Sequence, residues 1–469
     1  MNIDTILGEV TIRQRRKKLE EITRGNGLSD AYTATITRPK TQRGNKSVLG
    51  FKVLMWVLYS ERPLRTEELR HALAVEVGSA DLDSENIPAL RTLIASCLGL
   101  VTVEASSSTV RLVHFTLQEH LLSSPTLFYS PHSTIAEACL TYLNYDYVKD
   151  ISPTLGSAPS TMPLLEYASY YWGKHATSGM TENVKALALR LLDGFDEHIS
   201  GQLLLLRYLW GGHHDLLPPN GVPKSTGFTG LHGVAFLGIV EIVAAVLDMR
   251  EWDVNALDRT GQTALTWAAR RGHAEVVKIL LGREGLDPNH IRYGRTPLVS
   301  AVNYGHEEVV RVLLGREGVA PCQPFNGQTP LLRAVWCGHE GIVKALLERK
   351  DVDPNTARIP YGETPLMWAA DRGNECVIKM LLEREDIIPD HTLCNQTPLH
   401  HAALHGHKGI VKMLLEREDV NPDRVDTEHG STPLSLAARD GHEGVVRMLL
   451  ERGGVNPNMP SAKYGVTAL

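Results

Sequence analysis

One stretch of this sequence recurs down the C-terminal half of the chain at a nearly constant interval. Residues 261–281 read GQTALTWAARRGHAEVVKILL, and later copies keep the same threonine, small-residue, glycine and apolar positions in phase. Copies start at Gly261, Gly294, Gly327, Gly362, Asn395 and Gly430, with a degenerate copy from Gly227 and a further start at Gly465. Intervals of 33 to 35 residues are typical of a solenoid of stacked structural units.

Each copy is predicted to form two short helices. Thr263 and its equivalents are suited to cap the first helix. The proline that follows in five copies is tolerated there, because its missing N–H has no partner at a first helical position. Gly272 and its equivalents mark the end of this helix. The second helix has an apolar face that one unit cannot bury, so we expect neighbours to stack into one continuous core.

This frame resembles the ankyrin repeat. The pattern Gly-x-Thr-Pro-Leu, Ala-Ala-x-x-Gly-His and Val-Val-x-x-Leu-Leu covers about half of the chain, with seven copies in phase. The histidine that the family places after Thr-Pro-Leu is present as His232 and His400 and is replaced elsewhere. The resemblance implies about seven repeats over residues 227–464, starting near 227, 261, 294, 327, 362, 395 and 430, and a truncated repeat over 465–469.

The resemblance also implies a concave surface that binds other proteins. Positions +4, +7 and +8 after the cap threonine vary between copies, and we expect their side chains to be exposed on the first helix. They are rich in Trp, Tyr and Arg, which dominate the energy of interfaces. The predicted binding residues are Trp267, Arg270, Arg271, Asn303, Tyr304, Arg333, Trp336, Trp368, Asp371, Arg372, His401, Leu404, His405, Arg439 and Asp440. Ser300, Cys337 and Leu436 occupy the same positions. The alternative is that Trp267 and Trp368 only stack on each other across repeats.

No catalytic residues, metal site or cofactor are predicted. One histidine follows the inter-helix glycine in five copies: His273, His306, His339, His407 and His442. These residues are spaced by a whole repeat, too far apart to share an ion, and the resemblance implies that each bonds to the backbone of a neighbouring repeat. The sequence offers no recognisable nucleophile–base set or carboxylate pair.

A winged-helix domain is predicted over residues 51–122. Three helices, two strands and a further helix are expected in that order, and the third helix contains Arg91. The segments at 61–75, 97–103 and 110–121 resemble the winged-helix module, also named after GPI inositol-deacylase, of fungal NACHT–ankyrin (STAND-type) proteins. In that family the module follows the NACHT ATPase and packs against it.

That resemblance implies an intracellular immune-type receptor lacking its ATPase, since the sequence has no phosphate loop. Residues 1–50 are interpreted as a helical remnant that linked to the missing NACHT domain. Residues 123–226 are predicted to be a helical linker region, whose aromatic stretch at 164–172 packs in a core. This region ends in a proline-containing loop at 211–223, where His213 and His214 lack a third metal ligand at suitable spacing.

The predicted fold is therefore all-α dominated, and the predicted function is a non-catalytic scaffold for a partner protein. Two alternatives stay open: a regulatory fragment acting in trans on a NACHT ATPase, and a DNA-binding regulator. A net charge of −6 argues against a generic nucleic-acid binder, and Arg91 alone is too little for base readout. The cysteines lack the spacing of a disulfide framework, no signal peptide is recognised, and the apolar runs are too short to span a bilayer. We therefore predict a location in the cytoplasm or nucleus, without membrane insertion.

Overall fold

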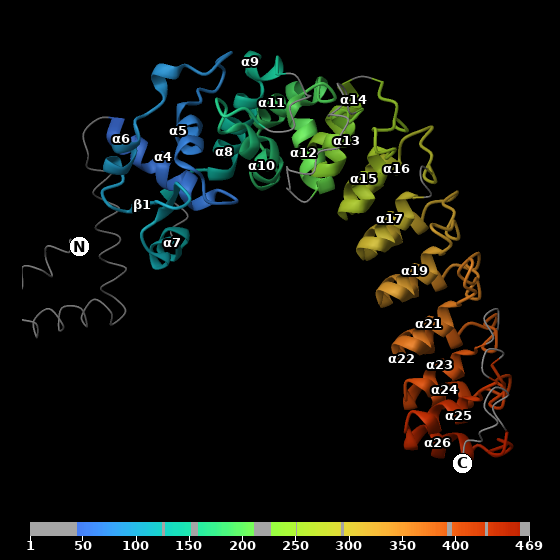
Figure 1. The fold of residues 1–469 in the computed structure, drawn as a ribbon. Coiled ribbons are helices and arrows are strands. Elements are labelled where there is room, and N and C mark those ends of the chain that lie inside the picture. The colour runs from blue at the N-terminus through green and yellow to red at the C-terminus, as the bar shows by residue number, and fades with distance from the viewer. Residues whose placement is uncertain are drawn as a thin grey trace, which may run out of the picture. The chain divides into compact units, whose positions relative to one another are not determined.

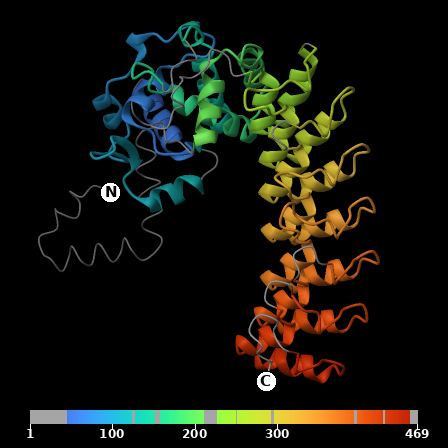
Figure 2. The ribbon, with the colours of Figure 1, turned by 45° about the vertical axis from the view of Figure 1, so that its right-hand side comes forward.

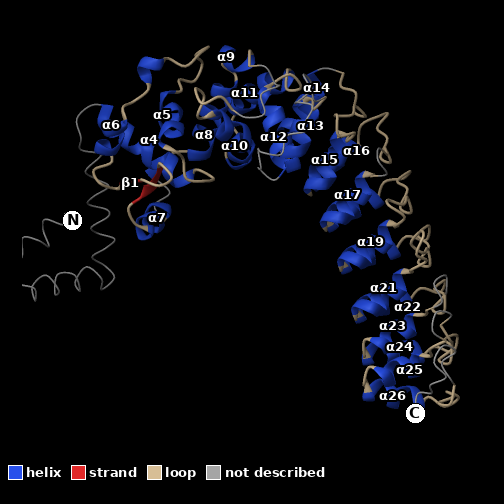
Figure 3. Ribbon diagram, viewed as in Figure 1, coloured by secondary structure: helices blue, strands red, loops and turns tan. Residues whose placement is uncertain are grey.

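The structure is a computed structural model (Figure 1). It describes residues 45–123, 127–151, 158–210, 227–249, 251–291, 295–391, 396–426 and 430–459. Several predicted features lie outside the described residues: the first 44 residues of the predicted remnant, the loop at 211–223 with His213 and His214, the repeat starts at Gly294 and Asn395, and the start at 465–469. The described residues are mostly helical (Figure 3), and the predicted all-α class is confirmed.

The chain divides into two units, which are described separately. Unit one comprises Met1–Gly233 with Ala244–Arg250, and unit two comprises Val234–Val243 with Glu251–Leu469. Among the described residues, no helix is both long enough and apolar enough to span a membrane.

The first part of unit one has the element order of a winged helix. The elements are α4 (Asn45–Tyr59), α5 (Thr66–Ala74), η1 (Ser84–Asn86), α6 (Leu90–Ser96), β1 (Val101–Glu104), β2 (Thr109–Leu112) and α7 (Phe115–Leu122). The strands form an antiparallel hairpin in which Val101 pairs with Leu112. Helix α4 begins earlier than predicted and contacts α5, α6, α7 and β2, so its buried side chains, among them Leu54 and Trp56, centre this core.

The rest of unit one is a helical region. Its helices are α8 (Pro131–Leu143), α9 (Asp146–Lys149), α10 (Leu165–Ser178), α11 (Glu182–Asp193) and α12 (Ile199–Trp210). Helix α8 packs against both α10 and α11. Tyr167 and Trp172 are fully buried, so the aromatic stretch belongs to the core, as expected.

The repeats form pairs of helices that follow one another along the chain (Figure 2). The degenerate first pair is α13 (Gly230–Leu237) and α14 (Val240–Met249). The later first helices are α15 (Ala264–Arg271), α17 (Pro297–Tyr304), α19 (Pro330–Cys337), α21 (Pro365–Arg372), α23 (Pro398–Leu404) and α25 (Pro433–Arg439). The later second helices are α16 (Ala274–Leu281), α18 (Glu307–Leu314), α20 (Glu340–Leu347), α22 (Glu375–Leu382), α24 (Lys408–Leu415) and α26 (Glu443–Glu451).

The stack has two layers. Each first helix from α15 onward contacts the first helix of the next repeat, and each second helix contacts the next second helix. The side chains between these layers are apolar and buried, for example Leu298, Val310 and Leu381. This arrangement confirms that neighbouring units bury a common core.

The predicted caps are present. The hydroxyl of Thr263 accepts a hydrogen bond from the backbone N–H of Thr266 at 3.1 Å, and the five later cap threonines make the equivalent bond. At His400, one of the two retained family histidines, Nδ1 accepts a hydrogen bond in return from the backbone N–H of Thr397 at 3.2 Å. These bonds satisfy backbone donors that a helix start leaves without partners.

Arginine and asparagine side chains that bond to the backbone of a neighbouring repeat were not predicted from the sequence, although the arginines belong to a recurring motif. The sequence Glu-Arg-x-Asp ends the second helix in three copies. In one of them, Arg384 donates to the carbonyl oxygen of Leu347 at 2.7 Å and forms an ion pair with Asp386 at 2.7 Å. Asn355 bridges in a similar way, donating to the carbonyl oxygen of Asp386 at 2.7 Å. Each bond joins one repeat only to its neighbour.

The histidines after the inter-helix glycines also join neighbouring repeats. Nε2 of four of them lies 2.9 to 3.2 Å from a backbone carbonyl oxygen of the preceding repeat: His273, His306, His407 and His442. This confirms the predicted backbone role for those four. The contact also requires glycine: Gly272 has φ +81°, and a Cβ there would lie 2.7 Å from Nδ1 of His306.

Replacing Gly272 by alanine tests this contact, with Gly285→Ala as the matched control. Gly285 has φ +75° and open space where a Cβ would lie, so its replacement should cost about 1–2 kcal/mol from backbone conformation alone. Gly272→Ala should cost about 1 kcal/mol more, because His306 must move and lose its bond to Arg270. Hydrogen exchange over α15 to α18 measures both changes, and equal effects would contradict a role for the ring.

Candidate functional site

The candidate site is the first-helix surface, which we define as positions +4, +7 and +8 of the first helices with the turns that precede them. Six predicted residues are exposed: Arg271, Tyr304, Arg372, His405, Arg439 and Asp440. Eight are half-buried: Arg270, Asn303, Arg333, Trp336, Trp368, Asp371, His401 and Leu404. A chemically varied surface therefore remains outside the core.

The prediction that Trp267 is exposed is wrong. Its side chain is 0% exposed, and its ring packs edge-on against Phe236 with 5.4 Å between centroids. Its indole N–H donates to a carboxylate oxygen of Asp258 at 2.7 Å. Position +4 faces the turn before its own helix and the first helix of the preceding repeat. A side chain at this position is therefore buried where residues of these two segments pack against it. Ser300 and Leu436, at the same position, are buried as well.

Two tryptophan rings do contact each other across repeats, but they are those of Trp336 and Trp368, in a tilted arrangement. Their ring centroids are 4.0 Å apart with an interplanar angle of 56°, across two neighbouring repeats. The guanidinium of Arg372 lies 5.4 Å from the ring centroid of Trp336 and 5.7 Å from that of Trp368. The alternative considered above, stacking of Trp267 on Trp368, does not occur, and Trp336 and Trp368 instead form a half-buried aromatic cluster at the surface.

The turn before α21 adds two residues that the helix positions could not identify. Arg358 lies over the rings of Trp336, at 5.7 Å, and Tyr361, at 4.6 Å. Tyr361 is 56% exposed. The arginine–tryptophan patch is defined as Arg333, Trp336, Arg358, Tyr361, Trp368 and Arg372. Its unpredicted members come from a turn, where variable residues in the sequence were not assigned to the surface.

Next to this patch, Asp371 brings two predicted residues together. One of its carboxylate oxygens lies 3.2 Å from Nδ1 of His401 and 3.1 Å from Nε2 of His405. The hydrogen bond from His401 lowers the pKa of Asp371 below its ordinary value, and so does the charge attraction of both histidines. Among the described residues no group of three or more His, Cys, Asp or Glu side chains could hold a metal ion.

A cavity of about 70 Å³ lies between the patch and Asp371, lined by Glu363, Met367, Trp368, Asp371 and His401. It is far smaller than the roughly 300–1,000 Å³ that small-molecule sites usually offer. This cavity is therefore too small to enclose a small-molecule ligand.

The other predicted residues group toward the two ends of the array. Nε of Arg270 donates to the hydroxyl of Tyr304 at 3.1 Å, which joins two repeats. Arg439 and Asp440 form an ion pair at 2.9 Å in the last described repeat. Nε of Arg333 donates to the amide oxygen of Asn303 at 2.5 Å, so the patch is connected to the repeat before it.

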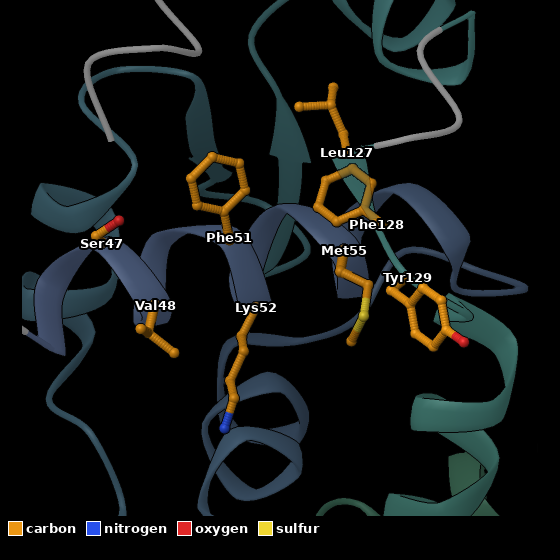
Figure 4. Close-up of a pocket in the computed structure, with 8 residues that line it drawn as sticks. All are labelled: Ser47, Val48, Phe51, Lys52, Met55, Leu127, Phe128 and Tyr129. Atoms are coloured by element: carbon orange, nitrogen blue, oxygen red, sulfur yellow. The ribbon is translucent and has the colours of Figure 1, made fainter. Parts of the chain in front are cut away.

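Unit one has a second surface feature, an apolar groove on the winged helix (Figure 4). Its volume is about 460 Å³, and its lining residues are Ser47, Val48, Phe51, Lys52, Met55, Leu127, Phe128 and Tyr129. Tyr129 is 95% exposed and Val48 is 56% exposed. The groove was not predicted, because it forms only where residues 127–129 return to α4.

Stacked helix pairs with a variable surface define a repeat scaffold of the solenoid class. The family described as ankyrin repeats (3 copies) matches residues 199–292, 284–358, 322–391, 350–426 and 366–461. These matches cover more than half of the chain, which belongs to the ankyrin repeat family. The GPI inositol-deacylase winged helix domain matches residues 39–130. Ankyrin repeats indicate a protein–protein interaction scaffold.

Solved ankyrin structures are similar to the repeat part of the chain. The human ASB11 ankyrin repeat domain is 28% identical, and the match covers 48% of this chain and 98% of that one, with a TM-score of 0.41. The ankyrin repeat domain of Bcl-3, a member of the IkappaB protein family, is 23% identical and covers 47% of this chain and 97% of that one, with a TM-score of 0.42. No curated protein matches the chain.

Proposed function

We propose that this chain is a non-catalytic scaffold that binds a partner protein through the first-helix surface of its repeats. The observation that carries the proposal is the pair Trp336 and Trp368. Both side chains lie outside the buried core, are half-buried at the surface and are close to arginines. Clusters of Trp, Tyr and Arg are where binding energy concentrates in interfaces. On the second helices some basic side chains pair with neighbouring carboxylates: Arg311 with Glu307 at 2.7 Å and Lys278 with Glu275 at 2.6 Å.

The domain combination supports a more specific role. The chain resembles fungal NACHT–ankyrin proteins, in which the repeats act as the ligand-sensing part of intracellular immune-type receptors. The winged-helix match at 39–130, preceding the repeats, is the expected neighbour in such a protein. The proposed role is therefore the sensing part of a receptor of this kind, acting in the cytoplasm.

Exposed residues of the first-helix surface provide the test. Tyr304→Ala combined with Arg372→Ala should reduce capture of at least one partner protein from the source cells by about ten-fold or more, since hot-spot losses reach 2 kcal/mol. Both residues are exposed, so the fold should persist. Quantitative mass spectrometry of the captured proteins makes the comparison.

The matched control is Lys278→Ala combined with Lys379→Ala, which changes two exposed residues on second helices. It should leave capture unchanged. A set of captured proteins that is the same for the unchanged chain and both double variants would contradict binding through the first-helix surface.

The groove on α4 favours a second candidate, a regulatory contact of the winged helix with a NACHT ATPase in trans. Val48, Phe51 and Tyr129 give the groove an apolar lining that a partner protein could cover. Val48→Ser with Tyr129→Ser should then abolish capture of the ATPase while the first-helix variant retains it. A DNA-binding role gains no such support: beside Arg91, the exposed residues of α6 are Thr92 and Ala95, which offer little for reading bases.

A further inference from the structure

We infer that the partner presents an acidic peptide segment to the arginine–tryptophan patch. This inference rests on the proposed function and adds the chemistry of the partner. It begins with the sequence of four successive turns and first helices, at 258–271, 291–304, 324–337 and 358–372. These stretches contain no lysine and eight arginines, Arg259, Arg270, Arg271, Arg292, Arg295, Arg333, Arg358 and Arg372. They contain three acidic residues, Asp258, Glu363 and Asp371, in a chain whose net charge is −6.

The acidic residues of these stretches already have partners within the chain. Asp258 is 2% exposed and accepts the hydrogen bond of Trp267. Glu363 forms an ion pair with Arg358 at 3.3 Å. Asp371 contacts His401 and His405, as described above. With eight arginines against three acidic residues, these stretches still carry a net positive charge.

Several of the arginines, in contrast, have no acidic partner. Within the described ranges, no carboxylate lies within ion-pair distance of Arg295, Arg333 or Arg372. On the opposite layer each arginine of the recurring Glu-Arg-x-Asp motif has one, at 2.6 to 2.7 Å: Arg349, Arg384 and Arg417. Positive charge that the chain leaves unpaired on one surface is complementary to a negatively charged partner.

The geometry of the patch favours carboxylates over nucleic acid bases. Arg358 lies over Trp336, and Arg372 lies over both tryptophan rings, so a base that stacked on these faces would have to displace a guanidinium group. A guanidinium placed over an aromatic ring still presents N–H donors in its own plane, and these bind a carboxylate in a bidentate manner. The half-buried rings of Trp336 and Trp368 supply apolar contact beside this charge. An acidic segment with interspersed apolar side chains matches both features.

The test selects ligands for the full chain from a phage-displayed library of random linear peptides. Selected peptides should be enriched in Asp and Glu relative to the unselected library. By fluorescence anisotropy, the tightest of them should bind the Arg333→Gln/Arg372→Gln variant at least about ten-fold more weakly, because two charged hydrogen-bonding groups are lost. The matched control, Lys344→Gln/Lys379→Gln, removes the same charge from exposed positions on α20 and α22 of the same repeats and should retain full affinity.

Two further probes separate the outcomes. The peptide with Asn and Gln in place of Asp and Glu should bind as weakly as the arginine variant does, and an oligothymidylate of equal charge should bind more weakly than the acidic peptide. Selection of neutral or basic peptides that still depend on Arg333 and Arg372 would overturn the inference and leave the proposed function standing. Selection of no peptide, binding that survives loss of both arginines, or tighter binding of the oligothymidylate would each overturn it.

Discussion

Trp267→Ala should lower the free energy of unfolding of the array by about 3–5 kcal/mol, the range for removing a fully buried tryptophan. The residue is 0% exposed and packs on Phe236, so its removal leaves a cavity between the first two repeats. It also removes the indole N–H that donates a hydrogen bond to the buried carboxylate of Asp258. Because repeats interact with their neighbours, the loss should be concentrated in α13 to α17, where hydrogen exchange measures it locally.

Trp368→Ala is the matched comparison, since it removes the same side chain at the same position of another repeat. Trp368 is half-buried, so its removal should destabilise the array by less than Trp267→Ala does. It should instead weaken partner binding directly, whereas Trp267→Ala should affect binding only by destabilising the array. Equal destabilisation by the two variants would contradict the distinction between a core tryptophan and a surface tryptophan.

Acidification from about pH 7 to about pH 5 should destabilise unit one by about 4 kcal/mol, from two buried histidines. Burial lowers the pKa of His175 to about 3 and that of His198 to about 4. In the unfolded chain both have the ordinary pKa of about 6.5, so below that pH the unfolded state binds protons that the folded state excludes. The contribution of these two histidines to the free energy of unfolding is therefore fully present above about pH 6.5, and it falls as the pH drops toward the pKa values of the folded protein.

Calorimetric unfolding at the two pH values measures this loss. His198→Gln should remove about half of it, because each histidine contributes about 2 kcal/mol. In the folded protein Nε2 of His198 donates to the carbonyl oxygen of Leu143 at 2.9 Å, and glutamine retains a donor there without titrating. An unchanged pH dependence in this variant would show that His198 is not responsible.

The sequence predicts those features of the array that residues at fixed offsets carry. Thr263 caps its helix, and the histidines after the glycines bond to the preceding repeat, because the backbone geometry of the frame dictates both. The exposure of position +4 depends on the neighbouring repeat instead. Phe236 and Asp258 contact Trp267, which is buried, whereas Trp368 at the same position contacts Trp336 and Arg372 and stays half-buried. Part of that difference is set by Phe236, which lies in the preceding repeat.

The groove on the winged helix and the turn residues of the patch were not predicted for a related reason. Phe128 and Tyr129 meet α4 only after the chain has passed through the whole domain. Arg358 and Tyr361 lie in a turn, where no helical period assigns a side chain to a surface. Periodicity identifies helices and their buried faces, but it does not determine which irregular segments return to cover or extend them.

The arginine and asparagine bonds between repeats have a mechanical consequence. Arg384 and Arg452 donate to carbonyl oxygens of the repeat before their own, those of Leu347 and Arg417 respectively, and Asn355 donates to a carbonyl oxygen of the repeat after. Tension applied along the array would thus be carried by similar links in series. The weakest link would yield first while the others held, so the array would lengthen in steps of one repeat.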